Sequence, residues 1–358
     1  MPPPPEEKEV VVSGAAGLGA AIASETGAEL GELEEIRARG YWELVWIRFK
    51  RDRVAVASGI FIFLLLFIAF GGAPIAKHFI GHGPSDIFTG TQAVSAGQLP
   101  AGPWTWIDYL KPPNYTETAH NVLVLGASNR LGQDEFLRLL YGAQVSLEVA
   151  GLSTLGVMII GVILGSIAGY FRGWVDTIIS RVTEITMAFP ALLFIIALAA
   201  TVGPRLDAIT LGIFSPGVIT LTLIFTVFGW FYPARIMRAQ VLSIREKEYI
   251  EAARMIGASD FRIIRSHVLP HLVAPMIVYS TLIVASYVLA EAGLSFLGIG
   301  IKPPTPSWGN LLADAPQYYT TRPLLMLWPG LAVLLTTLAF NLLGDGLRDA
   351  FDPRAAHR

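Results

Sequence analysis

The sequence contains no cysteine and few charged residues. Only 15% of its 358 residues are Asp, Glu, Lys or Arg, whereas typical globular domains carry about 25%. Hydrophobic residues make up 53% of the chain, and its mean hydropathy is +0.55. The missing cysteines exclude disulfides, thiolate metal sites and cysteine nucleophiles. The low charge excludes an ordinary soluble domain, because a soluble fold of this composition would expose large apolar patches, and we expect the chain to lie in a bilayer.

Motifs for catalysis and cofactor binding are also missing. No segment reads G-x-x-x-x-G-K-[ST], the loop that holds nucleotide phosphates, so we expect no ATP hydrolysis by this chain. No Ser/His/Asp arrangement or carboxylate pair can be located, and no substrate-binding residue is assigned. Two histidine pairs have the i, i+4 spacing of metal ligands, but glycines flank one histidine of the first pair and a proline interrupts the second: His78 with His82, and His267 with His271. We therefore predict no enzyme activity, no metal site and no cofactor in this chain.

Six uncharged runs have the length of a membrane span. A spanning helix needs roughly 17 to 25 mostly apolar residues, and each run has this length without Asp, Glu, Lys or Arg. Acidic residues lie just outside several run ends, where charge is less costly than at the bilayer centre. The sequence thus predicts six transmembrane helices. They comprise residues 54–70, 149–169, 185–202, 208–232, 272–290 and 324–343.

The distribution of basic residues predicts the orientation of these spans. With the N-terminus inside, the inside segments carry 19 of the 26 Lys and Arg and the outside segments carry 7. Basic residues near span ends favour the cytoplasmic side, and four of them lie between Arg48 and Arg53, directly before the first run. We therefore predict cytoplasmic N- and C-termini. The alternative that the first run is a signal peptide is disfavoured, because the run is too long for a signal core and no small-residue cleavage site follows it.

The composition between the spans predicts four regions. Residues 1–40 are poor in large apolar side chains, which is typical of a disordered cytoplasmic tail. Residues 41–70 combine an interfacial amphipathic helix with the first span. Residues 71–148 form an irregular extracytoplasmic segment, whose role is either packing and topology or docking of an outside partner; its end, residues 134–144, is expected to form a helix along the membrane surface. Residues 149–354 hold the remaining five spans.

Small residues recur within the second span. Gly161, Gly165 and Gly169 are spaced every four residues, so on a helix they form one flat ridge. Such a ridge lets a second helix approach closely. We predict helix packing at these glycines, with a role in lining a pore as the alternative.

The 39-residue inside loop at residues 233–271 has the most informative pattern. Seven of the basic residues lie in it. Residues 243–256 are predicted to form a helix that is broken by Gly257, a residue suited to the left-handed geometry of a helix C-terminus. Ser259 is expected to cap a second helix that begins near Asp260, whose acid favours an N-terminus.

We predict that this helical hairpin inserts into a groove on another protein. Pro270 is expected to end or bend its second helix before the fifth span. Ala252, Ala253 and Ala258 are small enough to permit close approach. The alternative is a solvated loop whose basic charge only obeys the positive-inside rule.

Several segments resemble the permease subunits of binding-protein-dependent ABC importers. Glu251-Ala252-Ala253, followed by Gly257 and then by Leu269-Pro270, is similar to their EAA loop. His267 lies where the general pattern has an apolar residue, as is common in the dipeptide, oligopeptide and nickel branch. Further segments resemble the C-type second permease of that branch: GYFRGWVDTIISRVTEITMAFP, LAEAGLSFLGIGIKPPTPSWGNLL and LAFNLLGDGLRDAFDPR. The stretch NRLGQDEFLRLLYGAQVSL departs more from the family pattern.

This resemblance implies an all-α, type I ABC importer permease fold in the inner (plasma) membrane. It implies a heterodimer with a second permease subunit, two ATPase subunits that bind ATP and Mg, and an extracytoplasmic substrate-binding protein. The loop at 233–271 would then couple the spans to an ATPase, with Gly257 supplying the turn, Glu251 a polar anchor and the alanines a close approach. The implied coupling residues are Glu251, Ala252, Ala253, Arg254, Gly257, Ala258, Ser259, Asp260 and Phe261.

The resemblance implies import of dipeptides or oligopeptides. Nickel chelates or another small solute on the same architecture are the alternative, and nucleic acid is not an expected partner. A self-contained secondary transporter would need ionisable residues inside its spans, and the six runs contain none. Glu291 lies just past the fifth run, where it is either a plain interfacial residue or part of an outer gate with the Gly-rich segment that follows.

Overall fold

The computed structural model describes residues 40–89, 91–95, 99–110, 118–209 and 215–352. The chain divides into two compact units, Met1–Ile47 and Arg48–Arg358. Of the first unit, only residues 40–47 are described, and they include the beginning of helix α2 (Tyr41–Arg51). The predicted disordered tail at residues 1–40 thus lies, apart from Gly40, outside the described residues.

The described part of the second unit contains four helices that are long and apolar enough to cross a membrane, and up to six spans if each of two bent helix pairs counts as one. The six predicted spans are thus the upper limit of the range that the described helices allow, and four is the lower limit. The first long helix, Arg53–Ile80, comprises α3 (Arg53–Phe67), the π-helical turn η1 (Ile68–Gly72) and α4 (Ala73–Ile80). The others are α5 (Glu135–Phe171), Asp260–Phe296 and α14 (Leu324–Phe351).

Prolines account for the two bent pairs. Helix α6 (Gly173–Ala188) meets α7 (Ala191–Ile209) at 84°, and Pro190 lies at the break. Helix α8 (Val218–Gly229) meets α9 (Phe231–Arg245) at 42°, and Pro233 lies just beyond that break. Proline has no backbone N–H to donate to the preceding turn and clashes with it, so a helix bends there. The third and fourth predicted spans are therefore bent rather than straight.

The long helices extend beyond the uncharged runs that predicted them. Helix α5 has 37 residues, about 56 Å at 1.5 Å per residue, whereas the bilayer core is about 30 Å thick. Residues 134–144 belong almost entirely to this continuous helix, so the prediction that they form a separate helix along the membrane surface is wrong. Helix α12 (Leu269–Phe296) likewise continues through Glu291.

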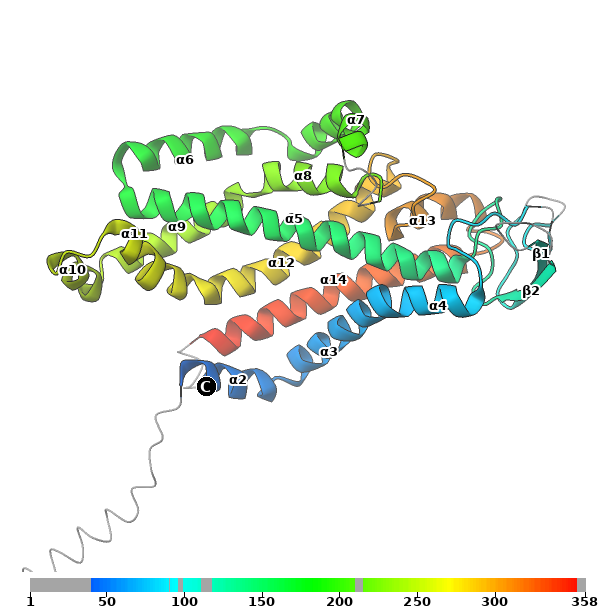
Figure 1. The fold of residues 1–358 in the computed structure, drawn as a ribbon, viewed down its shortest axis with the longest axis horizontal. Helices are drawn as coiled ribbons and strands as arrows, with labels where there is room; N and C mark the ends of the chain where they lie inside the picture. The colour runs from blue at the N-terminus through cyan, green and yellow to red at the C-terminus, as the bar shows by residue number, and fades with distance from the viewer. Residues whose placement is uncertain (1–39, 90, 96–98, 111–117, 210–214, 353–358) are drawn as a thin grey trace, which may run out of the picture. The chain divides into compact units, whose positions relative to one another are not determined.

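Residues 71–148, predicted to be an irregular extracytoplasmic segment, contain regular structure that the prediction did not include. Strands β1 (Thr105–Leu110) and β2 (Thr118–Leu123) pair antiparallel, with Thr105 opposite Leu123. A small core of Phe88, Ala93, Ile107, Tyr109, Leu123 and Ala127 stabilises this lobe. The fold is mostly helical as predicted, and the hairpin beside the start of α5 is the exception (Figure 1).

Helix α5 is central in the packing of the second unit. It contacts α8, α9 and α12 along its length (Figure 1). The glycine ridge faces α9: a Cβ on Gly161 would lie 2.7 Å from Pro233 Cβ, on Gly165 2.5 Å from the carbonyl oxygen of Ala234, and on Gly169 2.8 Å from that of Arg238. No side chain fits at these distances, so the ridge serves close packing of α5 on α9.

The remaining elements connect the spans at the two ends of the bundle. On one side a hairpin of short helices joins α9 to α12, and on the other a loop and two short helices join α12 to α14 (Figure 1). They are α10 (Glu248–Met255), α11 (Asp260–Ile263), the π-helical turn η2 (Ile264–Val268), α13 (Trp308–Asp314) and the 3-10 helix η3 (Ala315–Tyr318).

Candidate functional site

The hairpin between α9 and α12 turns at Gly257. This residue has a φ of +82°, a conformation that costs other residues free energy, and no atom lies within 4 Å of a Cβ built on it. Its backbone N–H donates to the carbonyl oxygen of Arg254 at 2.9 Å, and that of Ala258 donates to Ala253 at 3.0 Å. These bonds satisfy carbonyl groups at the end of α10. Glycine is therefore required here by backbone geometry and not by lack of space.

The helix boundaries of this hairpin differ from the prediction. One helix was expected over residues 243–256, but α9 ends at Arg245 and α10 begins at Glu248. Ser259 precedes α11 as expected, but within the described residues its hydroxyl makes no capping hydrogen bond. Pro270 does not end the helix: it directly follows the π-helical turn η2, and the helix continues unbroken from Asp260 to Phe296.

The base of the hairpin is attached to the end of α5. The Tyr170 hydroxyl donates to Asp260 Oδ1 at 2.6 Å, and Arg245 Nη1 donates to the Tyr170 carbonyl oxygen at 2.5 Å. The guanidinium of Arg254 lies 5.1 Å from the centre of the Tyr170 ring, within the range of a cation–π contact. Arg254 and Asp260, both implied as coupling residues, thus help to fix the hairpin to its own chain.

One predicted coupling residue lies in the core of the hairpin. Ala253 is buried and packs with Ile250, Ile263 and Val268 against α9. Its small size therefore serves packing beneath α10, so the expectation that it supplies close approach to a partner is wrong. Ala258 is half-buried against the same core, while Glu251, Ala252, Ser259 and Asp260 are exposed.

Large apolar side chains are exposed at the turn. Met255, Ile256 and Phe261 are 82%, 86% and 74% exposed, and together with Gly257 we call them the hairpin tip. The resemblance implied a role for Phe261, but Met255 and Ile256 were missed. The sequence feature that could have indicated them is a pair of bulky apolar residues between a short polar helix and the glycine of the turn. An exposed apolar group of this kind marks an interaction site.

At the other end of α12, Glu291 is completely buried. Its Oε2 accepts a hydrogen bond from the Ser146 hydroxyl at 2.6 Å, and its Oε1 accepts one from Ser295 at 2.7 Å. The Ser295 oxygen accepts in turn from the backbone N–H of Ile301 at 2.9 Å. The prediction of a plain interfacial position for Glu291 is therefore wrong.

This Glu291 network joins four parts of the chain: α5, α12, the following loop and α13. The backbone N–H of Trp308, at the start of α13, lies 3.4 Å from the Ser146 hydroxyl oxygen. The partner serines escaped the sequence analysis, although Glu291 and Ser295 have the i, i+4 spacing of neighbours on a helix. Glu291 thus fixes the loop and α13 on the membrane helices. Any gate formed by this loop would depend on these hydrogen bonds.

The lobe around the β1–β2 hairpin holds a second buried carboxylate. Asp134 caps α5, and its Oδ1 accepts from the backbone N–H groups of Phe136 and Leu137 at 2.8 and 3.3 Å. Its Oδ2 lies 3.5 Å from His82 Nε2. Burial raises the pKa of Asp134 to about 6, and burial lowers the pKa of His82. His82, one of the two histidines tested as a metal pair, thus lies inside the lobe core, in ring contact with Phe88.

Comparison with known proteins identifies the class of protein to which this chain belongs. Residues 161–357 match the family described as "Binding-protein-dependent transport system inner membrane component", and residues 40–93 match the "N-terminal TM domain of oligopeptide transport permease C". The chain belongs to the binding-protein-dependent inner membrane permease family. It is thus a transport permease, and the predicted type I ABC importer permease fold is confirmed.

Named relatives cover most of the chain. A glutathione transport system permease protein, GsiD, of Pectobacterium atrosepticum is 36% identical over 91% of this chain and 96% of its own length. A dipeptide transport system permease protein, DppC, of Alkalihalophilus pseudofirmus is 42% identical over 62% of this chain and 69% of its own. A solved structure of the MetNI methionine ABC transporter, in an inward-facing conformation, matches with a TM-score of 0.46 at 18% identity, over 61% of this chain and 97% of that chain.

Proposed function

We propose that this chain is the C-type permease subunit of an ABC importer that moves short peptides into the cell. In this proposal a second permease subunit completes the translocation path. Two ATPase subunits bind ATP and Mg on the cytoplasmic side, and a substrate-binding protein delivers the peptide from outside. This chain itself holds no cofactor and catalyses no reaction.

The exposure of the hairpin tip is the observation that best supports a role in coupling to an ATPase. Its three large apolar side chains are exposed, while the hairpin beneath them is fixed to α5 through Tyr170. An exposed apolar tip on a rigid base can transmit a movement only if a partner encloses the tip. We infer that an ATPase subunit does so, with Glu251 and Ala252 on the exposed side of α10 next to that contact.

The orientation of the chain follows from its basic residues. Seven of the 26 Lys and Arg lie in residues 233–271, and basic loops are retained in the cytoplasm. This orientation puts both termini and the hairpin on the cytoplasmic side, where ATP is available. The β1–β2 hairpin and the loop fixed by Glu291 then lie outside, on the side of the binding protein.

A short peptide is the proposed cargo because the named relatives carry related compounds. The relatives compared above are named for dipeptide and glutathione transport. The resemblance of residues 169–190, 289–312 and 338–354 to the C-type subunit of the peptide branch supports the same assignment.

Charge at the hairpin tip tests the coupling role. In Ile256→Asp the carboxylate would be buried in the ATPase contact without a partner, which is strongly unfavourable. We expect the membrane level of the chain to persist while the ATPase subunit no longer co-purifies and peptide uptake stops. Trp106→Asp is the matched control, because Trp106 is also exposed but lies on the outer hairpin. Unchanged co-purification of the ATPase with Ile256→Asp would contradict the proposal.

A further inference from the structure

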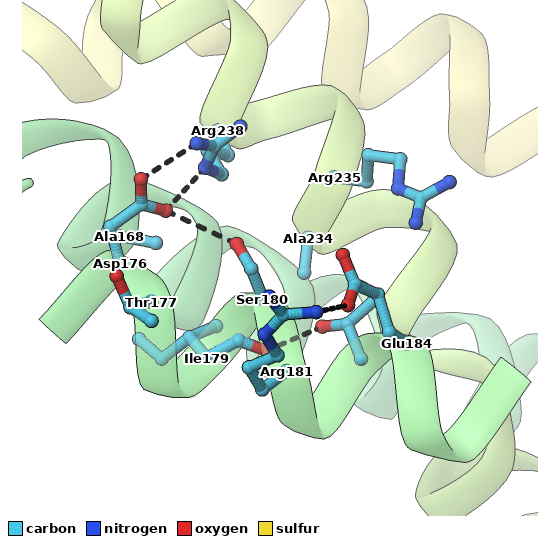
Figure 2. Close-up of a pocket in the computed structure, with 11 residues that line it drawn as sticks. Ala168, Asp176, Thr177, Ile179, Ser180, Arg181, Glu184, Ala234, Arg235 and Arg238 are labelled. Carbon is cyan, nitrogen blue, oxygen red and sulfur yellow. Dashed lines mark hydrogen bonds and ion pairs between the residues drawn. The ribbon is translucent and has the colours of Figure 1, made fainter. Parts of the chain in front are cut away.

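A polar cavity of about 340 Å³ lies between α5, α6 and α9. Its lining includes two carboxylates and three guanidinium groups, which Figure 2 shows on facing helices. They belong to Asp176, Arg181 and Glu184 of α6 and to Arg235 and Arg238 of α9. Its volume falls within the range of roughly 300 to 1,000 Å³ that is typical of small-molecule sites.

Helix α6 has a polar face that lines this cavity and an apolar face on its opposite side. Asp176, Ser180 and Glu184 are spaced by four residues and line the cavity. Trp174, Ile178, Val182 and Ile185 form the opposite face of the helix, and all four are exposed. Charged side chains in membrane helices face a protein interior or a water-filled space. The apolar face of α6 therefore suits lipid, and its polar face suits an aqueous cavity.

Two ion pairs in the cavity are complete within the chain. Asp176 accepts two hydrogen bonds from Arg238, from Nε at 2.5 Å and from Nη2 at 2.7 Å, which join α6 to α9. Arg181 Nη1 lies 2.7 Å from Glu184 Oε2 on the same helix. Figure 2 shows both pairs as dashed lines.

Arg235 differs from the other two arginines. It lies between Ala234 and Ile236 on α9 and is exposed. Within the described part of the chain its guanidinium has no hydrogen-bond or ion-pair partner (Figure 2). Since the other four charges cancel, the cavity carries one uncompensated positive charge.

The cavity lies near the end of α5 that also holds the coupling hairpin. Ala168, which lines the cavity, is two residues before Tyr170, whose hydroxyl bonds Asp260. In the proposed orientation this is the cytoplasmic end of the membrane helices. A solute that passes through the permease would meet this cavity last.

We propose that this cavity is the cytoplasmic part of the translocation path and that Arg235 contacts the carboxylate of the departing peptide. The inference rests on the proposed function. A guanidinium binds a carboxylate through two parallel hydrogen bonds, and no other group among the described residues occupies the donors of Arg235. Asp176 and Glu184 are already paired with Arg238 and Arg181, so the net positive charge of the cavity favours an anionic group. The carboxylate of a peptide and the phosphate of an anionic lipid share this chemistry, and uptake in vesicles of different lipid composition distinguishes them.

Single cysteines test whether the cavity is aqueous, because the chain has no cysteine of its own. Ser180→Cys would place a thiol on the cavity face of α6, and Val182→Cys would place one on the apolar face of the same helix. In membranes that hold the assembled complex, we expect a charged thiol reagent to modify Ser180→Cys at least about tenfold faster. Equal rates, or faster modification of Val182→Cys, would overturn the assignment of the cavity to the path.

Arg235→Gln tests the contact with the peptide. In proteoliposomes that hold the complete importer, we expect peptide uptake to fall about tenfold, as for loss of a hydrogen bond to a charged group, while ATP hydrolysis stimulated by the loaded binding protein stays within about twofold. Arg53→Gln is the control, since Arg53 is an exposed basic residue at the start of α3, outside the cavity. Arg235→Lys should restore part of the uptake, because it keeps the positive charge.

The other outcomes of this experiment are distinct. Uptake unchanged in Arg235→Gln, or an equal loss of uptake and ATP hydrolysis, would overturn the inference. If the variant loses uptake only in vesicles that contain phosphatidylglycerol and equals the unmodified protein in phosphatidylcholine vesicles, the cavity binds anionic lipid and the inference is wrong. If the unmodified complex assembles but imports no peptide, the proposed function itself fails.

Discussion

The two ends of the helix that runs from Asp260 to Phe296 have opposite surroundings. At one end, Glu291 is completely buried, and both of its carboxyl oxygens accept hydrogen bonds from serines of the same chain. At the other end, Phe261 is 74% exposed beside Met255 and Ile256. The Glu291 end is polar yet enclosed, and the Phe261 end is apolar yet exposed.

This difference separates structural residues from residues that await a partner. A buried polar group stabilises a fold only when its hydrogen bonds are made, and the Glu291 network meets this condition within the chain. Neighbouring exposed apolar groups mark an interaction site, and those of the hairpin tip are not covered within the described residues. We therefore assign the Glu291 end a positioning role and the Phe261 end a contact role.

The largest expected effect is that of Gly257→Val. A β-branched residue at a φ of +82° is strained by roughly 1 to 2 kcal/mol, so the tip would lose its geometry. We expect peptide uptake to fall to background while the chain stays in the membrane, as measured by uptake and immunoblot. Gly81→Val is the control, because Gly81 has a φ of +79° in the outer lobe. Normal uptake by Gly257→Val would remove the basis for the contact role.

Glu291→Ala should act mainly on stability. It would leave the hydroxyl groups of Ser146 and Ser295 without their acceptor, at a cost of roughly 1 to 3 kcal/mol, and we expect a lower melting temperature of the purified chain in detergent. Co-purification of the ATPase should be unaffected. Glu291→Gln keeps one acceptor oxygen and should be milder; if its uptake equals that of the unmodified protein, the outer-gate hypothesis for Glu291 has no support.

Tyr170→Phe tests the attachment of the hairpin base. The change removes the hydrogen bond to Asp260, worth about 1 kcal/mol, without altering the packing of the ring. We expect a small decrease in thermal stability and a larger loss of peptide uptake per ATP hydrolysed, because the tip would be less firmly connected to α5. Tyr319→Phe, at an exposed tyrosine beyond η3, is the control. Equal coupling in both variants would show that the Tyr170 bond does not transmit movement.

The smallest expected effect on peptide uptake is that of pH, which acts on the stability of the lobe. Burial raises the pKa of Asp134 from 3.8 to about 6, so the folded lobe favours the protonated carboxyl. The resulting stability is fully present below about pH 4 and is lost as the pH rises through 6. Asp134→Asn keeps the cap and removes the charge. Its melting temperature relative to the unmodified protein should therefore be higher at pH 8 than at pH 4, and a constant difference would contradict this pKa.

The positions of the spans could be predicted because they depend on composition alone. Charge is absent from six runs, and a bilayer selects for that absence. The ends of the helices could not be predicted in this way, because Glu148 and Glu291 lie inside helices. Glu291 is tolerated there through hydrogen bonds with Ser146 and Ser295, and such a tertiary arrangement is not visible in a single run of residues.

The candidate site could be predicted only where backbone geometry determines which residue type is possible. Gly257 adopts the left-handed turn expected of it, since few other residues can do so. Exposure depends on what packs beneath, so Ala253 proved to be buried while Met255 and Ile256 are exposed. The β1–β2 hairpin was not predicted. Strand β1 does alternate exposed Trp106 and Asp108 with buried residues, but the alternation is too short to indicate a strand.

The central claim is that the hairpin tip contacts an ATPase subunit, and cross-linking tests it most directly. Since the chain has no cysteine, Ile256→Cys would carry its only thiol and can be joined to a photoactivatable reagent in the assembled complex. The account predicts a cross-linked product that contains this chain and the ATPase subunit, and none from Trp106→Cys on the outer hairpin. Failure of Ile256→Cys to cross-link the ATPase in an assembled, actively importing complex would contradict it.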